Sequence, residues 1–486
     1  MQYSDRTATL ILSALLALNF LLMVLPLSAG ALKIQALAWR AAIALPLRAL
    51  FATGRRMTAY IPPRQRPALL FTLLVIFTTG SRAQPNAATV NPAPAAAAVS
   101  AALPDDIIRL RNEGNDAVFN LDYAAARLKF EEVRAKLPDH PAGDLYVATL
   151  IWLDHLNKSR RLQTGLYQNE SFYAGADKAK EETEGDAVEQ STERAFREAI
   201  NRARAKAIAL VVRTNKKDAD ALYFRGAVYG VIAAYDASVA RKFWGAMRNG
   251  SRGVDDHQEV LKLRPDYFDA NLSVGLYNYI VGSLPFAMRA LAAIGGIRGN
   301  RDKGIAQLED AMYKGRYVSD DARVMLVALY QNEKRPQDAL KLLQNLSQRF
   351  PKNYLLRMEM ANTMAQLKQY NEAYAVYDDL LKNDEGRAAD LIHFQYAEAL
   401  VSGQEYARAV THFLDIGKLP KAEAGLVTQS MLRAGQASDM AGKRAEAIAQ
   451  YKAVLARPNI YDSREQAEKG LKQPHKEKEK KRLGED

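Results

Sequence analysis

The sequence contains no cysteine among its 486 residues. Disulfide bonds, thiolate metal sites, thiol catalysis and a lipid anchor on an N-terminal cysteine are therefore excluded. Histidine is also scarce, and no HExxH motif or other paired metal-ligand spacing occurs. The six histidines are His140, His155, His257, His393, His412 and His475. We therefore expect no metal site.

A phosphate-binding loop of the form GxxxxGKS or GxxxxGKT is also missing. The stretch from Gly295 to Gly299 follows a helical pattern and does not end in Lys-Ser or Lys-Thr. The cluster Asp255, Asp256 and His257 has the residue types of metal ligands, but adjacent helix residues point in different directions. We therefore interpret the cluster as a solvated helix start. We predict that the chain is not an enzyme and holds no cofactor.

Basic residues outnumber acidic ones, which gives a formal net charge of +12. Residues 1–83 hold nine Lys or Arg and a single acid, Asp5, so this segment accounts for +8. The remaining +4 is spread over the rest of the chain, without a basic stripe between aromatic residues. We therefore expect no nucleic-acid partner.

Two apolar segments precede the part of the chain with helical patterning. Thr9–Leu27 is long enough to span a bilayer, whereas Ala68–Thr79 is shorter. The second segment follows two arginines and ends in Gly-Ser-Arg-Ala, the order of a secretory signal that is cleaved after Ala83. Residues 57–83 are therefore predicted to be a signal peptide or a membrane anchor.

Met57 is an alternative start, so residues 1–56 are either an upstream extension or a first membrane helix. In the second case the arginine-rich loop between the apolar segments stays cytoplasmic, and in both cases the folded part is exported. Residues 84–104 are rich in Pro and Ala and predict a linker. We expect a protein that is periplasmic, or anchored in the inner membrane and facing the periplasm, with membrane association through the N-terminal segment.

From Asp105 onward, a helical pattern recurs at a period near 34 residues. Each repeat has a small residue, a large apolar residue four positions later and another apolar residue after three more. The small residue lets two helices approach closely, and the large one fills the gap toward the next hairpin. The triplets are Ala126/Phe130/Val133, Gly304/Leu308/Ala311, Ala339/Leu343/Leu346, Ala373/Tyr377/Leu380, Ala409/Phe413/Ile416 and Ala447/Tyr451/Val454.

This pattern divides the chain into regions. Residues 105–265 predict an N-terminal helical region that is partly off-register, with a polar insertion at 168–190 that we interpret as a loop between two long helices. Residues 266–459 predict a solenoid of hairpins. Residues 460–486 predict a capping helix followed by a charged tail.

On these triplets, the sequence resembles the tetratricopeptide-repeat (TPR) superfamily over residues 107–140 and 266–459. The resemblance implies an all-α fold: an α-solenoid of TPR helix hairpins with an irregular central hairpin, preceded by the N-terminal export segment. It also implies a scaffold that works by binding a protein partner. The sequence fixes neither the identity of that partner nor the oligomeric state.

The stretch from Tyr267 to Gly315 departs most from the repeat, because it places an apolar arm inside a hairpin. It resembles the central block of the TPR proteins that include the fungal inclusion-body-clearance protein and its animal relatives. The matching residues are Gly275, Leu276, Asn278, Leu284, Pro285, Gly299, Asn300, Arg301 and Gly304. This resemblance implies a TPR scaffold with a membrane- or assembly-related role.

Three interpretations of this segment stay open. It is an irregular structural hairpin, or Phe286–Ile297 touches a membrane surface, or its aromatic and arginine side chains border a pocket or partner groove, since such side chains are common interface anchors. The residues of the third interpretation are Tyr277, Asn278, Tyr279, Arg289, Arg298 and Arg301.

The first helices of the hairpins are expected to line the concave side of a TPR solenoid. The residues expected there are Gln331, Asn332, Asn362, Gln366, Gln395 and Glu398. They are polar and nearly uncharged, and they do not reproduce the Lys/Asn clamp by which some TPR domains hold a C-terminal carboxylate. We predict an envelope adaptor or scaffold that binds a folded patch or an extended segment. The alternative is a binding subunit for a small or polymeric ligand held near residues 275–304.

Overall fold

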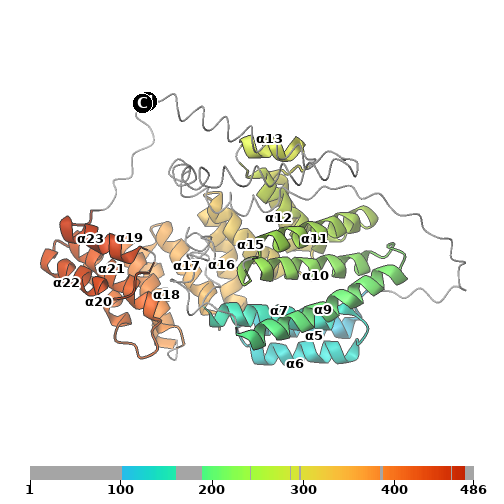
Figure 1. The fold of residues 1–486 in the computed structure, drawn as a ribbon, viewed down its shortest axis with the longest axis horizontal. Helices are drawn as coiled ribbons and strands as arrows, with labels where there is room; N and C mark the ends of the chain where they lie inside the picture. The colour runs from blue at the N-terminus through green and yellow to red at the C-terminus, as the bar shows by residue number, and fades with distance from the viewer. Residues whose placement is uncertain are drawn as a thin grey trace, which may run out of the picture.

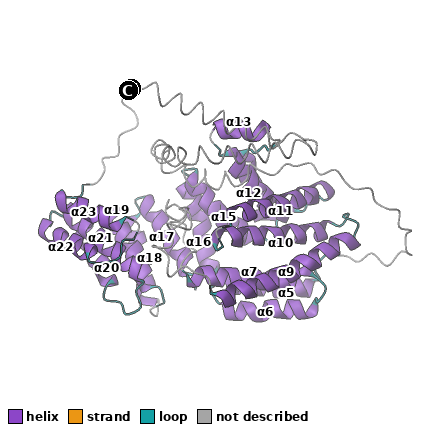
Figure 2. Ribbon diagram, in the orientation of Figure 1, coloured by secondary structure: helices purple, strands orange, loops and turns teal. Residues whose placement is uncertain are grey.

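The computed structural model describes residues 101–159, 189–240, 242–284, 286–294, 297–383, 387–460 and 462–476. These residues form helices and connecting loops and include no strand (Figure 2), so the all-α prediction is confirmed. The predicted export segment, the linker up to residue 100, the insertion up to residue 188 and the tail from residue 477 lie outside the described residues. None of the described helices is long and apolar enough to cross a membrane.

The N-terminal half consists of helices that pair with their neighbours in sequence (Figure 1). They are α5 (Asp105–Phe119), α6 (Tyr123–Lys136), α7 (Pro141–Lys158), α9 (Gln190–Arg213), α10 (Ala219–Ser238) and α11 (Phe243–Leu263). Local sequence sets where they begin. Asp122 and Asp218 each accept a hydrogen bond from a backbone N–H in the first turn of α6 and α10, respectively. Pro141 occupies the first turn of α7, where its missing N–H has no intrahelical partner to lose.

The C-terminal half begins with a single 3-10 turn and continues as helix hairpins. The elements are η4 (Phe268–Ala270), α12 (Asn271–Gly282), α13 (Phe286–Ile294), α14 (Arg301–Lys314), α15 (Ser319–Asn332), α16 (Pro336–Arg349), α17 (Tyr354–Gln366), α18 (Tyr370–Asn383), α19 (Ala389–Ser402), α20 (Tyr406–Ile416), α21 (Ala424–Met440), α22 (Arg444–Leu455) and α23 (Ser463–Lys472). The last helix stands where the capping helix was predicted.

The six predicted triplets form the packed seams of the hairpins, because every one of their residues is buried. Small residues on the first helices face the large triplet residues. A Cβ atom on Gly114 would lie 2.3 Å from the ring of Phe130, and one on Gly435 would lie 2.8 Å from the ring of Tyr451. Both contacts are too short for any side chain, so the interhelical distance requires glycine.

The turns inside the hairpins share a feature that the sequence pattern does not reveal. Five of them contain a residue with positive φ, always nine positions before the large residue of the triplet. These residues are Leu121, Lys334, Lys368, Gln404 and Gly442, with φ between 57° and 75°. Only one is glycine, the residue that adopts this left-handed conformation without steric cost.

The N-terminal hairpin folds back onto the middle of the chain. The rings of Phe119 and Phe350 stack with their centroids 4.8 Å apart. The Asn353 amide donates to the carbonyl of Phe119 over 2.7 Å, and Arg316 pairs with Asp105. One continuous hydrophobic cluster therefore extends from Ala101 to Phe350.

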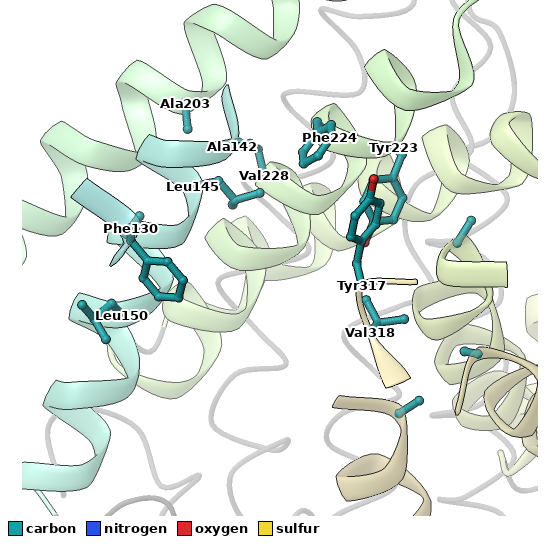
Figure 3. Packing of buried hydrophobic residues seen from close by; sticks show 14 of the residues in the cluster. Phe130, Ala142, Leu145, Leu150, Ala203, Tyr223, Phe224, Val228, Tyr317 and Val318 are labelled. Atoms are coloured by element: carbon teal, nitrogen blue, oxygen red, sulfur yellow. The ribbon is translucent and has the colours of Figure 1, made fainter. Parts of the chain in front are cut away.

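Figure 3 shows part of this cluster, in which Tyr223 of α10 lies against Tyr317 and Val318 of the loop before α15. Ala101, the first described residue, is fully buried, although it lies a few residues before the predicted end of the linker. A second cluster, of residues between Met358 and Ala437, follows along the chain. The described structure thus has a closed N-terminal part and an open arm of hairpins, α17–α23.

The arm curves with its first helices on the inside. Contacts join α17 to α19, α19 to α21 and α21 to α23, whereas no comparably close contact joins α16, α18, α20 and α22 to one another among the described residues. Helices that approach each other across successive hairpins lie on the concave side of a solenoid. The expected placement of the first helices on that side is therefore what the structure shows.

Candidate functional site

Polar side chains connect the first helices of successive hairpins along the concave side. Gln331 of α15 donates to the Thr363 hydroxyl over 2.7 Å, and Asn362 of α17 donates to the side-chain oxygen of Gln395 over 3.3 Å. Arg433 of α21 forms a bidentate pair with Glu398 of α19, at 2.5 and 2.7 Å. We call this set of contacts the polar ladder.

The ladder continues to the C-terminal end of the arm. The Gln436 amide of α21 donates to Gln466 of α23 over 3.4 Å. A tyrosine from the second helix supports one of the rungs, because the Tyr377 hydroxyl donates to the side-chain oxygen of Asn362. The ladder side chains are therefore held in fixed positions before any partner arrives.

Two residues predicted to belong to this face have side chains that project into solvent. Gln366 and Asn332 are exposed, whereas Asn362, Gln395 and Glu398 are half-buried. The Glu398 charge is compensated by Arg433, so the face stays nearly neutral, as its composition predicted. Partner binding by Asn362, Gln366 and Gln395 stays a prediction.

The central segment places Tyr279 and Arg301 on a single carboxylate. The buried Tyr279 hydroxyl donates to Oε1 of Glu333 over 2.9 Å, and the Arg301 guanidinium lies 3.3 Å from Oε2. Burial, followed by the hydrogen bond to Glu333, raises the pKa of Tyr279 above its usual range. Tyr279 is only 7% exposed, so replacing it with alanine would remove core packing.

Asn278 belongs to a second internal chain of hydrogen bonds. Its amide donates to Gln307 of α14 over 2.6 Å, and Gln307 in turn donates to Asn271 over 3.3 Å. Tyr277 packs against a small apolar cluster formed by Val281, Leu284, Ala292 and Ile297. These contacts attach α12 to α14 and to α13.

The helices of the central segment approach too closely to leave space for a ligand between them. A Cβ atom on Gly282 would lie 2.3 Å from the backbone nitrogen of Arg301, and one on Gly304 would lie 2.5 Å from that of Tyr279. The segment is therefore a tightly packed hairpin, and the alternative function of holding a ligand near residues 275–304 is not favoured. Arg289 and Arg298 remain exposed at its edge.

Asp255, Asp256 and His257 are not the solvated helix start that the sequence suggested. They lie inside α11, and the side chains of Asp256 and His257 are buried. Asp256 forms a bidentate pair with Arg225 of α10, and the two His257 ring nitrogens lie near Ser273 and the carbonyl of Tyr223. The interpretation was wrong because the helix begins at Phe243, well before these residues, and packs against α10.

Asp269 is a buried carboxylate that sequence reasoning missed. It accepts hydrogen bonds from the backbone N–H groups of Arg316, Tyr317 and Val318, at 3.1, 2.5 and 3.1 Å. These bonds hold the loop between α14 and α15 against the closed part. A lone aspartate before a helix gives no sequence signal for such a role, because its partners are backbone groups far along the chain.

His393 of α19 and His412 of α20 face each other inside one hairpin. Their Nδ1 atoms lie 2.9 Å apart, so one imidazole donates and the other accepts. Burial, and then the neighbouring His393, lowers the pKa of His412 to about 4. No group of three or more His, Asp or Glu that could hold a metal occurs in the described part of the chain.

A pocket of about 330 Å³ lies where the N-terminal hairpin meets α17. It is lined by Asp116, Ala117, Asn120, Asp122, Pro351 and Lys352. One wall is the last turn of α5 with the turn that follows it, and the other is the loop between α16 and α17, so the pocket follows from the closure. It holds no arrangement of acid, base and nucleophile.

Taken together, antiparallel hairpins with small residues facing large ones, and first helices on the inner side of a curve, define a helical-repeat fold. Residues 330–392 match the family model described as tetratricopeptide repeat. This match lies within the region that the triplets predicted to resemble tetratricopeptide repeats. No curated protein matches it.

Solved structures of TPR proteins are similar to parts of the chain. A thermophilic TPR protein of Thermus thermophilus, TTC0263, is 18% identical with a TM-score of 0.29, covering 53% of this chain and 97% of that one. Yeast Tom70 is 11% identical with a TM-score of 0.34, covering 76% and 89%. The human IFIT1 dimer with PPP-AAAA is 15% identical with a TM-score of 0.36, covering 76% and 85%. At these TM-scores none of the three says anything about function here. The resemblance of the central segment to the inclusion-body-clearance proteins stays a prediction.

Proposed function

We propose that the chain is a non-enzymatic TPR scaffold that binds a protein partner in the cell envelope along the concave face of α15–α23. The polar ladder is the observation that carries this proposal. The amide side chains on the inner side of the solenoid hold one another in place before binding. Little of their conformational entropy is therefore lost when a partner binds. The export signal predicted for residues 57–83 supports the envelope location.

The chemistry of the ladder favours an extended segment of polypeptide. Side-chain amides both donate and accept, as does the peptide group, so Asn and Gln side chains can hydrogen-bond the main chain of a bound segment. Because Arg433 and Glu398 neutralise each other, the face does not select a strongly charged partner. Specificity would then come from the side chains of the bound segment that lie between the hydrogen-bonded pairs of the polar ladder.

The proposal can be tested with a photo-crosslinking amino acid placed at Gln366 in the source cells. Gln344, an equally exposed glutamine on the second helix α16, is the matched control position. We expect one dominant envelope protein to crosslink from position 366 and not from position 344. Equal crosslinking from both positions, or none from either, would contradict the proposal.

A pair of double variants separates binding from folding. Asn362→Ala with Gln395→Ala removes a rung, whereas Gln344→Ala with Asn345→Ala removes the same side-chain types from an exposed position on α16. We expect the first pair to reduce crosslinking from position 366 about tenfold, as for loss of two interface hydrogen bonds, and the second to leave it unchanged. Circular dichroism should show both variants folded.

A further inference from the structure

α13 exposes an unusual helix face. Phe286, Arg289, Ala290 and Ala293 are all exposed, and their spacing places them on one side of the helix. The buried Ala292 packs instead with the small apolar cluster of α12. Exposed helix faces in water usually carry charged and polar side chains, whereas this one carries an aromatic ring, two methyl groups and one guanidinium.

Phe286 is the most exposed of the large apolar side chains in the described structure, at 78%. In Figure 1, α13 stands at the edge of the molecule beyond α12. Exposing an aromatic ring to water is unfavourable, and covering the ring with another surface lowers the free energy.

The charged residues of the segment that carries this face have a single sign. From Ala270 to Arg301 the sequence has no Asp or Glu, although the whole chain has 55 of them, and its charged residues there are Arg289, Arg298 and Arg301. Arg301 is engaged with Glu333, but Arg289 and Arg298 are exposed. Arg289 anchors its guanidinium through the carbonyl of Gly282, at 3.2 Å, which fixes the charge near the helix.

We propose that this face, formed by Phe286, Arg289, Ala290, Ala293 and Arg298, lies on an anionic membrane surface. A helix with an apolar face and flanking arginines sits in the headgroup region, where the ring enters the acyl boundary and the guanidinium groups bind lipid phosphates. At nine residues α13 is far too short to span a bilayer, so it contacts only one leaflet.

A lipid surface fits these observations better than a second protein does. Ala290 and Ala293 make the face shallow, so Phe286 is the large apolar side chain among its five residues. The carboxylate-free segment matches a surface of phosphates. The apolar N-terminal segments, if they bring the chain to a bilayer as predicted, would present the domain to such a surface at high effective concentration.

The absence of cysteine allows a direct test. A chain that starts at Gln84 keeps the whole described core, which begins at Ala101, and lacks the N-terminal apolar segments that would bind vesicles themselves. Phe286→Cys provides a unique site for an environment-sensitive fluorophore. Leu128→Cys is the matched control, because Leu128 on α6 is 73% exposed.

We expect the probe at position 286, and not at 128, to shift to shorter emission wavelength with vesicles of phosphatidylcholine containing about one-third phosphatidylglycerol. Pure phosphatidylcholine should give no shift. Arg298→Gln should weaken partition into the anionic vesicles about fivefold, the effect of one arginine near such a surface. Arg204→Gln, an exposed arginine of α9, is the control and should change nothing.

Flotation of the unlabelled protein with the same vesicles supplies a second measurement, in which Phe286→Ser should reduce binding. Equal spectral shifts at positions 286 and 128, or anionic binding that survives both Arg298→Gln and Phe286→Ser, would overturn the proposal. So would a Phe286→Ser variant that floats normally but loses its protein crosslinks, because the face would then belong to a protein partner. Loss of vesicle binding with unchanged crosslinking from Gln366 would keep this inference separate from the proposed function.

Discussion

The ring of Phe119, at the end of α5, stacks on the ring of Phe350, which follows α16, at an interplanar angle of 18°. This contact joins the first hairpin to the middle of the chain and closes the N-terminal part. We therefore expect the stability of the N-terminal part to depend on this contact as well as on the packing within the repeats.

We expect Phe350→Ala to lower the free energy of unfolding by about 4 kcal/mol, since Phe350 is only 2% exposed and its loss leaves a cavity. Urea unfolding followed by circular dichroism measures this change. Phe286→Ala removes an equally large ring that is exposed and should change stability by less than about 0.5 kcal/mol. Equal effects of the two variants would show that Phe350 contributes no buried packing.

Asp269→Asn should destabilise the closed part by about 3 kcal/mol. The amide keeps one acceptor oxygen but places donors against the backbone N–H groups of residues 316–318, which leaves buried groups unpaired. Asp266→Asn, three residues earlier with a side chain that is 72% exposed, is the control and should be neutral. Amide hydrogen exchange at residues 316–318 should accelerate in the first variant alone.

Two glycines with open surroundings should respond oppositely to alanine. Neither Gly230 nor Gly442 has an atom within 4 Å of an added Cβ, but Gly442 has φ of +75° and Gly230 lies within α10. Gly442→Ala should cost about 1 kcal/mol from backbone strain, and Gly230→Ala should stabilise by up to about 1 kcal/mol from helix propensity. Thermal unfolding of the two variants measures both changes in stability. Changes in the same direction would contradict the left-handed conformation at Gly442.

Acid should weaken the arm through His412. Its pKa in the folded protein is lowered to about 4, whereas the unfolded imidazole titrates near pH 6.5. Between these values the unfolded chain binds a proton that the folded chain does not, so stability is complete above about pH 6.5 and falls as the pH approaches 4. We expect a loss of about 1 kcal/mol from this half-buried site, allowing for solvent screening.

The measurement is the urea midpoint at about pH 7 and about pH 5, for the wild type and for His412→Gln. The variant should lose less stability than the wild type on acidification. His140 and His257 also have lowered pKa values because of burial, so the difference between the two proteins is the informative quantity. An identical pH dependence would show that the pair does not titrate with unfolding.

Tyr279→Phe should cost about 1.5 kcal/mol, because the Glu333 carboxylate loses a buried donor. Tyr313, a tyrosine of α14 that is 77% exposed, gives the control variant Tyr313→Phe, which should be neutral. Crosslinking from Gln366 should be unaffected by both. A change in crosslinking with unchanged stability would instead place Tyr279 in the partner site.

The hairpins could be predicted because their signal is local. Ala373, Tyr377 and Leu380 lie within two turns of one helix, and their spacing alone indicates which side is buried. The left-handed turns could not be predicted in the same way. Lys334, Lys368 and Gln404 are ordinary surface residues, and the packed helices on either side of each turn impose the backbone conformation.

The closure and the central network depend on distant partners. Phe119 and Phe350 are both apolar residues near a helix end, which is a common position for such residues. The local sequence around one does not indicate that it contacts the other. Tyr279 and Arg301 were recognised as unusual, but their shared partner Glu333 belongs to a different hairpin. The pairing of side chains in the polar ladder likewise depends on residues about 30 positions apart, which a local pattern does not indicate.

The division into a closed part and an open arm also determines how the chain would respond to force. In the described part of the arm the close contacts join successive helices and successive hairpins, so tension would open α23, α22 and α21 in succession. The closed part, with its ends joined through Phe119 and Phe350, would resist until it ruptured as a unit. A partner bound along the arm, as proposed, would therefore be held by a flexible arm on a stiffer base.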